Sequence, residues 1–409
     1  MLAALAVVSC GGSGTPVTPT TPATPVTLTG VVFNLLIGSD SRVAGARIEI
    51  TQGSGLGRVT TSDASGAYRF ENLDRGSLTL TISINGYQTT TRVLTLTANG
   101  ESNIGLTPTR ISASGTTVDA VSGAPVGNVS ITGGESAVTS DGAGTFTVTT
   151  ASSTATTAPF VFTSPLTVER RTSLRLPGAA ASVPLLPTSF DIAAFNQMFR
   201  APSLERWTTA LPLRLEMRAA TFRTGTSEFT LNDIVMSDAE ASSIIADLTT
   251  ALPQLTGGKF TAFASVVRQT SPAGSTFRVL NTGALTVIRT RDQERLNGSI
   301  GLAQTQTLTN GTIVGGAIML DLDYDRSTRP FVYTLRAHEL GHNVGMNHVT
   351  TRSSVMDPTV EIRDILPFDR DAARAAYQRP PGNRAPDIDP EGSSLNSLGG
   401  TATWGPRIR

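Results

Sequence analysis

At 409 residues the chain is longer than one ordinary domain, and we expect two to four domains. Basic and acidic residues balance at 32 each, and with no basic patch this argues against a nucleic-acid-binding protein. The single cysteine excludes intramolecular disulfides, and a composition rich in Thr, Ser, Gly and Ala with 5% aromatic residues favours β-sandwich modules and polar linkers over helical bundles.

Residues 1–10 are expected to be an export signal. Their apolar run is too short to span a bilayer and lacks a positively charged start. It ends in Val7-Val8-Ser9-Cys10, which resembles the lipobox of bacterial lipoproteins. The resemblance implies acylation of Cys10, export, and a lipid anchor in the membrane at the bacterial cell envelope or surface; a short apolar leader with a chance cysteine is the alternative. Residues 11–26 carry recurrent prolines, which predict an extended, semi-rigid tether.

Two tandem β-sandwich modules are predicted at residues 27–108 and 109–187. Short runs of alternating apolar and polar residues, separated by turns, are typical of such sandwiches. The second segment repeats the first, because residues 139–146 echo the turn and strand that begin at Thr61. Self-similarity of this kind indicates two copies of one module.

Both modules resemble the transthyretin-like sandwich that serves as the regulatory domain of some carboxypeptidases and recurs in bacterial surface proteins. Neither contains a histidine or an acidic cluster with metal-ligand spacing. Asp63 and Asp141 are expected to cap their turns, with calcium binding as the alternative. We therefore interpret the modules as spacers, or as surfaces for a protein or carbohydrate partner.

Residues 188–380 have longer and more aromatic side chains and are expected to form a separate domain. The spacing of Ser237 and Glu240 is that of a capping box at a helix start. Asp369 is expected to cap the last helix, and residues 381–409, polar and rich in Pro and Gly, are expected to be disordered. Periodicity predicts helices over 190–199, 237–252 and 368–377, and strands over 211–217, 284–289 and 316–322.

All three histidines of the chain fall within eleven residues. His338 and His342 are four residues apart, so on a helix they share one face and can bind one ion. Gly345 can take a positive φ and turn the chain back, which brings His348 to the same ion. Three neutral imidazoles with an open fourth position describe a catalytic zinc site, and Glu339 can reach a metal-bound water.

This stretch matches H-E-x-x-H-x-x-G-x-x-H at every fixed position and resembles the metzincin metallopeptidases. Residues 354–358 resemble the methionine turn of that family, which implies that Met356 forms an apolar floor under the ligands. The resemblance implies peptide hydrolysis with Glu339 as general base. The implied ligands of Zn²⁺ are His338, His342 and His348. We expect a multidomain chain, with two tandem all-β sandwiches followed by an α+β metzincin-like domain of a twisted sheet and an active-site helix.

The sequence leaves the substrate edge and the reaction open. Residues 312–319 are either the sheet edge that in metzincins takes up the substrate as an added strand, or a plain core strand. The zinc helix is expected to begin near Ser327-Thr328, with Pro330 in its first turn. The expected substrate is a protein or peptide. The alternatives are a surface-anchored binding protein that acts through its β-modules and has an inactive zinc domain, and a zinc amidase or deacylase with a non-peptide substrate.

Overall fold

A computed structural model describes residues 24–222, 229–291, 299–359, 364–393 and 406–408. The chain forms two compact units, one up to residue 110 and one from residue 111 onward. The expected signal with Cys10, and the tether up to residue 23, lie outside the described residues. Within the described ranges, no helix has the length and apolar character needed to cross a membrane.

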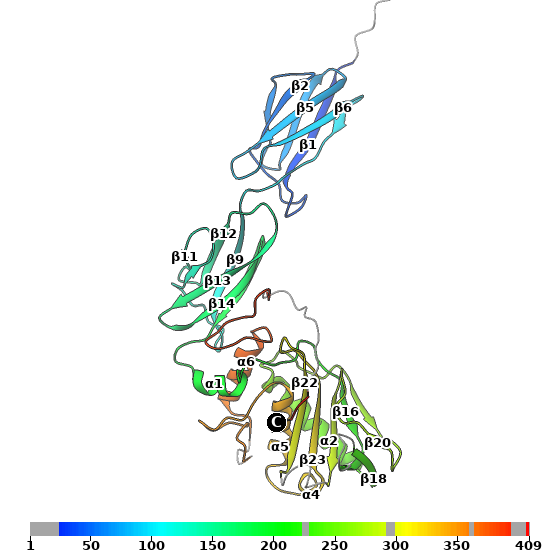
Figure 1. The fold of residues 1–409 in the computed structure, drawn as a ribbon. Coiled ribbons are helices and arrows are strands. Elements are labelled where there is room, and N and C mark those ends of the chain that lie inside the picture. Colours follow the sequence, from blue (N-terminus) through cyan, green and yellow to red (C-terminus); the bar gives the residue numbers. More distant parts are fainter. Residues whose placement is uncertain (1–23, 223–228, 292–298, 360–363, 394–405, 409) are drawn as a thin grey trace, which may run out of the picture. The chain divides into compact units, whose positions relative to one another are not determined.

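The first unit is a sandwich of two sheets around one apolar core (Figure 1). Its strands are β1 Val26–Asn34, β2 Arg47–Gly53, β3 Val59–Thr61, β4 Ala67–Leu73, β5 Gly76–Ser83, β6 Thr90–Leu96, β7 Gly100–Glu101 and β8 Ile104–Leu106. One sheet has the order β3-β2-β5-β6; in the other, β4 lies on one side of β1 and β7 and β8 on the other. Val26, Leu28 and Val32 of β1 alternate with less buried residues, so their side chains share the core face.

The second module repeats this strand order. Its strands are β9 Ile111–Asp119, β10 Ser130–Thr132, β11 Val138–Thr139, β12 Thr145–Thr150, β13 Thr156–Ser164, β14 Thr167–Leu176 and β15 Gly178–Leu185. One sheet is β11-β10-β13-β14 and the other is β12-β9-β15, with β15 parallel to β9 as β7 and β8 are parallel to β1. The internal repeat seen in the sequence is therefore a repeat of topology.

The second module shares its core with the region that follows it. Ala120 and Leu186 are fully buried in the same apolar cluster as the helices beyond residue 187. Arg374 and Gln378 of the last helix donate to the main-chain oxygens of Val121 and Ala120, at 2.6 and 3.0 Å. Residues 111–409 thus form one unit, although the sequence suggested a boundary near residue 187.

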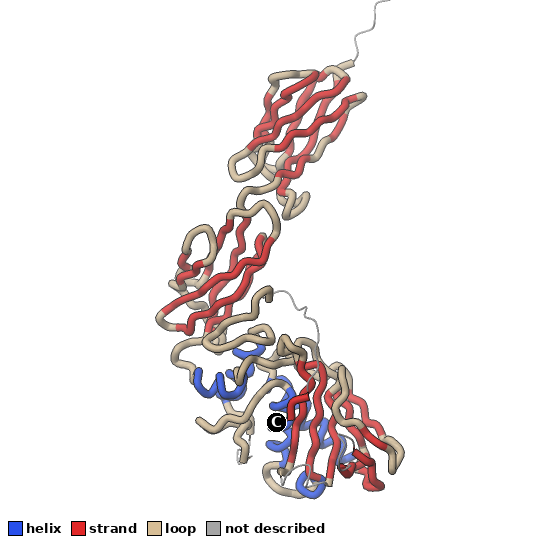
Figure 2. Tube along the Cα trace, viewed as in Figure 1, coloured by secondary structure: helices blue, strands red, loops and turns tan. Residues whose placement is uncertain are grey.

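The rest of the second unit is a curled mixed sheet with helices, which confirms the expected fold class (Figure 2). Its strands are β16 Leu213–Glu216, β17 Arg218–Phe222, β18 Phe229–Val235, β19 Val266–Gln269, β20 Thr276–Phe277, β21 Leu285–Thr290, β22 Gly301–Thr307, β23 Ile313–Asp321 and β24 Pro406–Ile408. The order is β20-β18-β17-β21-β23-β22-β24, and β16 joins β19 to β21. All six residues of β21 are buried, as in a strand covered on both faces.

Strand β23 settles the alternative left open for residues 312–319. It pairs in parallel with β21 on one side and antiparallel with β22 on the other. It is therefore an inner strand and not the sheet edge. Its two neighbouring strands cover its edges, α5 packs against it, and most of its residues are buried.

Five helices accompany this sheet in the part of the second unit that the structure describes (Figure 1). They are α1 Ile192–Phe199, α2 Asp238–Leu255, α4 Leu322–Asp325, α5 Val332–Asn343 and α6 Pro367–Tyr377. The predicted capping box is present: the Ser237 hydroxyl accepts from the Glu240 main-chain N–H, and the Glu240 carboxylate accepts from that of Ser237. Helix α5 packs against β22 and β23, and α2 packs against α5.

Helix α5 begins later than the sequence suggested. Its first residue is Val332, preceded by Phe331 without a side-chain cap. Asp321 caps the short helix α4 instead, and the Ser327 hydroxyl donates to the Tyr324 main-chain oxygen at the end of that helix. Ser327 is thus used to end one helix and cannot start the next.

The segment after α6 is ordered up to residue 393, which corrects the expected disorder of residues 381–409; residues 394–405 and 409 lie outside the described residues. Asn383 and Asp387 have no exposed surface. Asp387 accepts from Arg379, Arg200 and Arg170, at 2.6 to 3.4 Å. Composition alone suggested a loose tail because the arginines that neutralise this aspartate come from distant elements.

Candidate metal centre

Three histidine side chains meet at one point beside α5. His338 and His342 lie one turn apart on α5 and are buried, and His348 comes from the exposed loop beyond it. Each pair of Nε2 atoms is separated by 3.2 Å. Four ligands placed tetrahedrally at the usual Zn–N distance lie about 3.3 Å from each other. The triad therefore has the spacing of three zinc ligands and could hold a metal ion such as zinc.

The protonation of the rings supports the same conclusion. His338 Nδ1 lies 2.8 Å from the Val355 oxygen, and His342 Nδ1 lies 2.8 Å from the Met346 oxygen. A carbonyl oxygen only accepts, so in the neutral form of each ring the proton is on Nδ1 and Nε2 carries a bare lone pair. Burial lowers the pKa of His338 to about 4, which keeps the ring neutral at pH 7. Lone pairs at 3.2 Å repel each other unless a cation lies between them.

Gly345 produces the return of the chain that the sequence predicted. Its φ is +102°, and a Cβ there would lie 1.8 Å from the main-chain oxygen of Glu205. Both the backbone conformation and the close approach exclude any other residue. The next residues are held in place, because Asn347 donates to the Met198 oxygen of α1 from its main-chain N–H at 2.7 Å and from its side chain at 3.1 Å.

Met356, the residue expected to form an apolar floor, packs against Gly341 of α5, the residue before His342. It is fully buried, and a Cβ on Gly341 would lie 2.4 Å from its Sδ, so the thioether packs directly against α5 between the two helical histidines. The residue before it, Val355, supplies the carbonyl that orients His338. Residues 355 and 356 thus contact α5 at His338 and at Gly341.

Asp369 is a functional residue that sequence reasoning placed in another role. It was expected to cap α6, but its buried carboxylate also accepts from Ser354 Oγ at 2.6 Å and from the Val355 N–H at 2.9 Å. It accepts from the Leu366 N–H at the start of α6 as well. Asp369 therefore ties the methionine turn, and through Val355 the ring of His338, to α6. The spacing of the sequence carries no signal for this contact.

Glu339 lies beside the triad with its side chain enclosed. It is 5% exposed, and burial raises the pKa of its carboxyl to about 8. Its Oε2 has no hydrogen-bond partner among the described residues. A carboxyl group that is buried without a fixed partner is poised to exchange a proton with a ligand.

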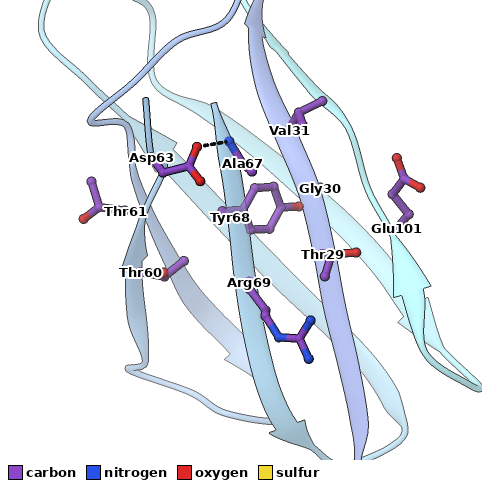
Figure 3. Close-up of a pocket in the computed structure, with 10 residues that line it drawn as sticks. All are labelled: Thr29, Gly30, Val31, Thr60, Thr61, Asp63, Ala67, Tyr68, Arg69 and Glu101. Atoms are coloured by element: carbon purple, nitrogen blue, oxygen red, sulfur yellow. Dashed lines mark hydrogen bonds between the residues drawn. The ribbon is translucent and has the colours of Figure 1, made fainter. Parts of the chain in front are cut away.

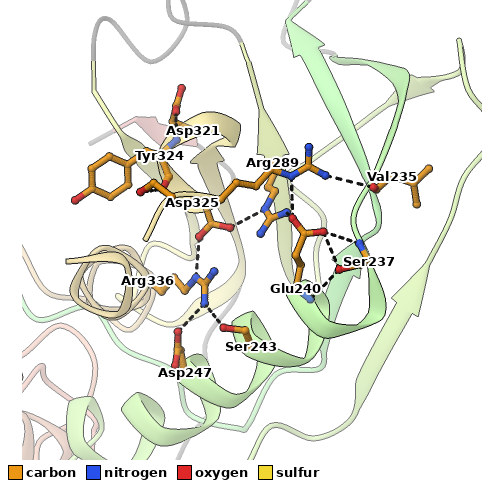
Figure 4. Close-up of polar contacts among 12 residues, drawn as sticks. Val235, Ser237, Glu240, Ser243, Asp247, Arg289, Asp321, Tyr324, Asp325 and Arg336 are labelled. Carbon is orange, nitrogen blue, oxygen red and sulfur yellow. Dashed lines mark hydrogen bonds and ion pairs between the residues drawn. The ribbon is translucent and has the colours of Figure 1, made fainter. Parts of the chain in front are cut away.

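Helix α5 is held from its other side by ion pairs (Figure 4). Asp325, which is fully buried, accepts from Arg336 of α5 at 2.8 Å and from Arg289 of β21 at 2.6 Å. Arg336 also donates to Asp247 at 2.6 Å, and Arg289 to Glu240 at 2.7 Å. These pairs fasten the helix that carries two histidines to α2, α4 and β21.

The β-modules show no comparable site. Among the described residues, only the histidine triad brings three metal-ligating groups together. Asp63 caps its turn as predicted, accepting from Ser65 and Ala67, and Asp141 does the same for Ala143 and Thr145. The first module has an open groove of about 590 Å³ across β1 and β4 (Figure 3). Polar side chains from β1, β3, β4 and β7 line it.

Residues 27–109 match the family model of the carboxypeptidase regulatory-like domain, which confirms the family resemblance predicted for the first module. No curated protein matches the chain. The match to the family model ends at residue 109, so it gives no family for the second unit.

Several solved structures are similar to part of this chain. The Bacillus anthracis TIE protein is 16% identical, with 39% of this chain and 34% of that chain covered and a TM-score of 0.20. The shaft pilin SpaA from Lactobacillus rhamnosus GG is 12% identical over 41% and 99%, with a TM-score of 0.26. A cohesin–X-dockerin complex from Acetivibrio cellulolyticus is 19% identical over 20% and 58%, with a TM-score of 0.18. Likenesses this weak carry no inference about function.

Proposed function

We propose that the protein is a zinc-dependent endopeptidase that hydrolyses peptide bonds of extracellular or envelope proteins. One observation carries the proposal: three Nε2 atoms lie 3.2 Å from one another, and Oε2 of Glu339, the buried residue that follows His338, has no hydrogen-bond partner among the described residues. A structural zinc site would need a fourth protein ligand. The exposed position of His348 instead supports a site that solvent and substrate could reach.

The residues divide the work between binding and proton transfer. A zinc ion bound by His338, His342 and His348 would act as a Lewis acid on the scissile carbonyl and would lower the pKa of a bound water. Glu339 would act as general base: its carboxylate would accept a proton from the attacking water and return it to the leaving amine. Burial raises the pKa of the Glu339 carboxyl to about 8, and a bound cation would lower it from there, which suits a group that both accepts and donates a proton.

Export and anchoring complete the proposal. The apolar start and the lipobox-like Val7-Val8-Ser9-Cys10 support a lipoprotein at the bacterial cell envelope or surface, held by a lipid on Cys10. The proline-rich tether would then hold the first module away from the membrane. Its substrates would be proteins or peptides outside the cytoplasm.

A second candidate function rests on the first module. Its family match and its open groove favour a surface-anchored binding protein that contacts a protein or carbohydrate, with the zinc domain inactive. Hydrolysis of a non-peptide amide is the remaining candidate, because the same zinc and carboxylate chemistry would serve it.

The test is zinc content and casein cleavage by purified residues 24–409, with and without a chelator. One zinc per chain and cleavage that the chelator abolishes support the peptidase. One zinc without cleavage of casein or of a peptide library, but with release of acyl groups from acylated sugars, would favour the amidase or deacylase. A chain that binds no zinc would rule out the site and leave the β-modules as the functional part.

A further inference from the structure

The first residue of strand β22 lies directly against the carboxylate of Glu339. An ideal Cβ on Gly301 would lie 2.5 Å from Glu339 Oε1 and 3.0 Å from its Cδ. It would also lie 2.8 Å from Cδ1 of Leu335, one turn earlier on α5. Real Cβ atoms do not approach other atoms this closely, so the space that Glu339 occupies exists only because residue 301 has no side chain.

The backbone of Gly301 does not itself require glycine. Its φ lies outside the left-handed region, unlike that of Gly345 or Gly311. An L-residue could therefore adopt the same conformation without strain. The reason for a glycine here is the space beside it.

The strand cannot move away to make room for a side chain. Gly301 pairs with Leu320 of β23, and the Asp321 N–H donates to the Ile300 oxygen at 2.9 Å. On the other side, α5 is fastened by Arg336 and its two acidic partners. The gap between β22 and α5 is thus set from both sides, and the Glu339 carboxylate fills it.

We propose that Gly301 is a positioning residue for Glu339. The main chain at the start of β22 packs against the Glu339 carboxylate and keeps the carboxylate in one orientation toward the histidine triad. Glu339 needs this contact because no hydrogen bond holds its Oε2 among the described residues. The proposal adds a positioning residue to the proposed endopeptidase. It rests on that function only for the loss of turnover expected when Glu339 is displaced.

The test is a double-mutant cycle with Gly301→Ala, Glu339→Ala and the double variant, followed by thermal unfolding, zinc content and turnover. In the wild-type background, the new methyl group must displace the Glu339 carboxylate. Misplacing a catalytic group by about 1 Å costs about 100-fold in rate, so kcat should fall about 100-fold while KM and the one bound zinc are kept. Gly142→Ala is the matched control: Gly142 has an ordinary φ and no atom within 4 Å of the added Cβ, so all three measurements should stay at wild-type values.

The unfolding temperatures test the contact without any activity. Removing the Glu339 side chain removes two of the three close contacts, so Gly301→Ala should lower Tm less in the Glu339→Ala background, by about 2 °C or more. Equal Tm changes in both backgrounds, together with unchanged turnover of Gly301→Ala, would overturn the proposal. If the wild-type chain cleaves nothing, the endopeptidase function fails, and the Tm cycle still decides whether Gly301 positions Glu339.

Discussion

At the scale of single residues, the metal centre depends on hydrogen bonds as much as on its ligands. Val355 and Met346 offer main-chain oxygens to the Nδ1 atoms of His338 and His342. Such outer contacts set the tautomer and the direction of each ring and raise its basicity toward a metal. Asp369 holds one of these carbonyls in place, although it lies far from the ligands in the sequence.

Replacing Glu339 with glutamine should separate metal binding from turnover. The amide has the same shape but cannot accept a proton, so kcat should fall by about 100- to 10,000-fold. Zinc should stay at one per chain, because Glu339 is not a ligand. Metal analysis and the rate of peptide cleavage on the same sample measure both. A variant that is as active as the wild type would show that another group is the base.

Replacing Asp369 with alanine should weaken the metal site from a distance. Ser354, Val355 and Leu366 would lose their acceptor, and the carbonyl that orients His338 would be free to move. Loss of an outer contact of this kind typically lowers metal affinity about 10- to 100-fold, which competition with a chelator would measure. Asp371→Ala on the same helix is the control and should keep the wild-type affinity. Equal affinities of the two variants would contradict the role assigned to Asp369.

At the scale of elements, α5 is the part on which both halves of the site depend. One face carries the two histidines, and the opposite side carries Arg336, which is bound to Asp325 and Asp247. Burial lowers and the ion pairs raise the pKa of Arg336, and the ion pairs prevail, so the guanidinium stays charged. A buried pair contributes little net stability when intact but costs a great deal when one partner is removed.

Replacing Asp325 with alanine should therefore destabilise the second unit strongly. It would leave Arg289 and Arg336 buried without their shared partner, at a cost of about 3–5 kcal/mol in the free energy of unfolding. Asp323→Ala in the same short helix is the matched control. Its pair with Arg291 is exposed, so the cost should stay below about 1 kcal/mol. Urea unfolding of both variants would measure the difference, and similar losses would contradict the account.

At the scale of the whole molecule, a buried cluster of charged side chains joins distant segments of the second unit. Arg170 of β14, Arg200 after α1 and Arg379 after α6 all donate to Asp387 of the C-terminal segment. The cluster joins the second β-module, the helices around the metal centre and residues 383–389. The second module is therefore part of the same body as the histidine triad, and the first module is the separate unit.

Asp387 should make the stability of this unit depend on acid. Burial alone would raise the pKa of its carboxyl, but Arg379 and Arg170 outweigh burial and hold it well below its usual range. With the pKa lower in the folded than in the unfolded state, the contribution is complete above about pH 4 and is lost as the pH falls further. Asp387→Asn should flatten the change of the urea midpoint between about pH 4 and pH 2. An unchanged acid slope would contradict this.

Truncation should show where the folded unit ends. A chain that stops at residue 380 loses both aspartates that neutralise Arg170, Arg200 and Arg379. It should unfold at lower temperature and be cleaved rapidly by an added protease, because buried arginines would be left without partners. A chain that stops at residue 393 keeps these contacts and, of the described residues, loses only the three-residue edge strand β24 beside β22, so it should unfold at a temperature much closer to that of the full chain. If both truncated chains were equally stable, the segment would have no role in folding.

The sequence determined what short-range geometry can decide. The four-residue spacing of His338 and His342 and the glycine at 345 were enough to predict the triad. Alternation was enough to predict the strands of the modules, and the Ser237–Glu240 spacing was enough to predict the start of α2. Each of these depends on residues within one turn or one strand of each other.

The tertiary structure decided the contacts between elements distant in sequence. In the folded chain β23 is an inner strand, and Asp369 binds the main chain at Val355. Gly301 lies against Glu339, and the segment around Asp387 is ordered by buried ion pairs. The tertiary structure also moved the start of α5 to Val332, because Asp321 and Ser327 are used by a different helix. These contacts come from packing and from neutralising buried charge, and no local pattern reports which distant element supplies the partner.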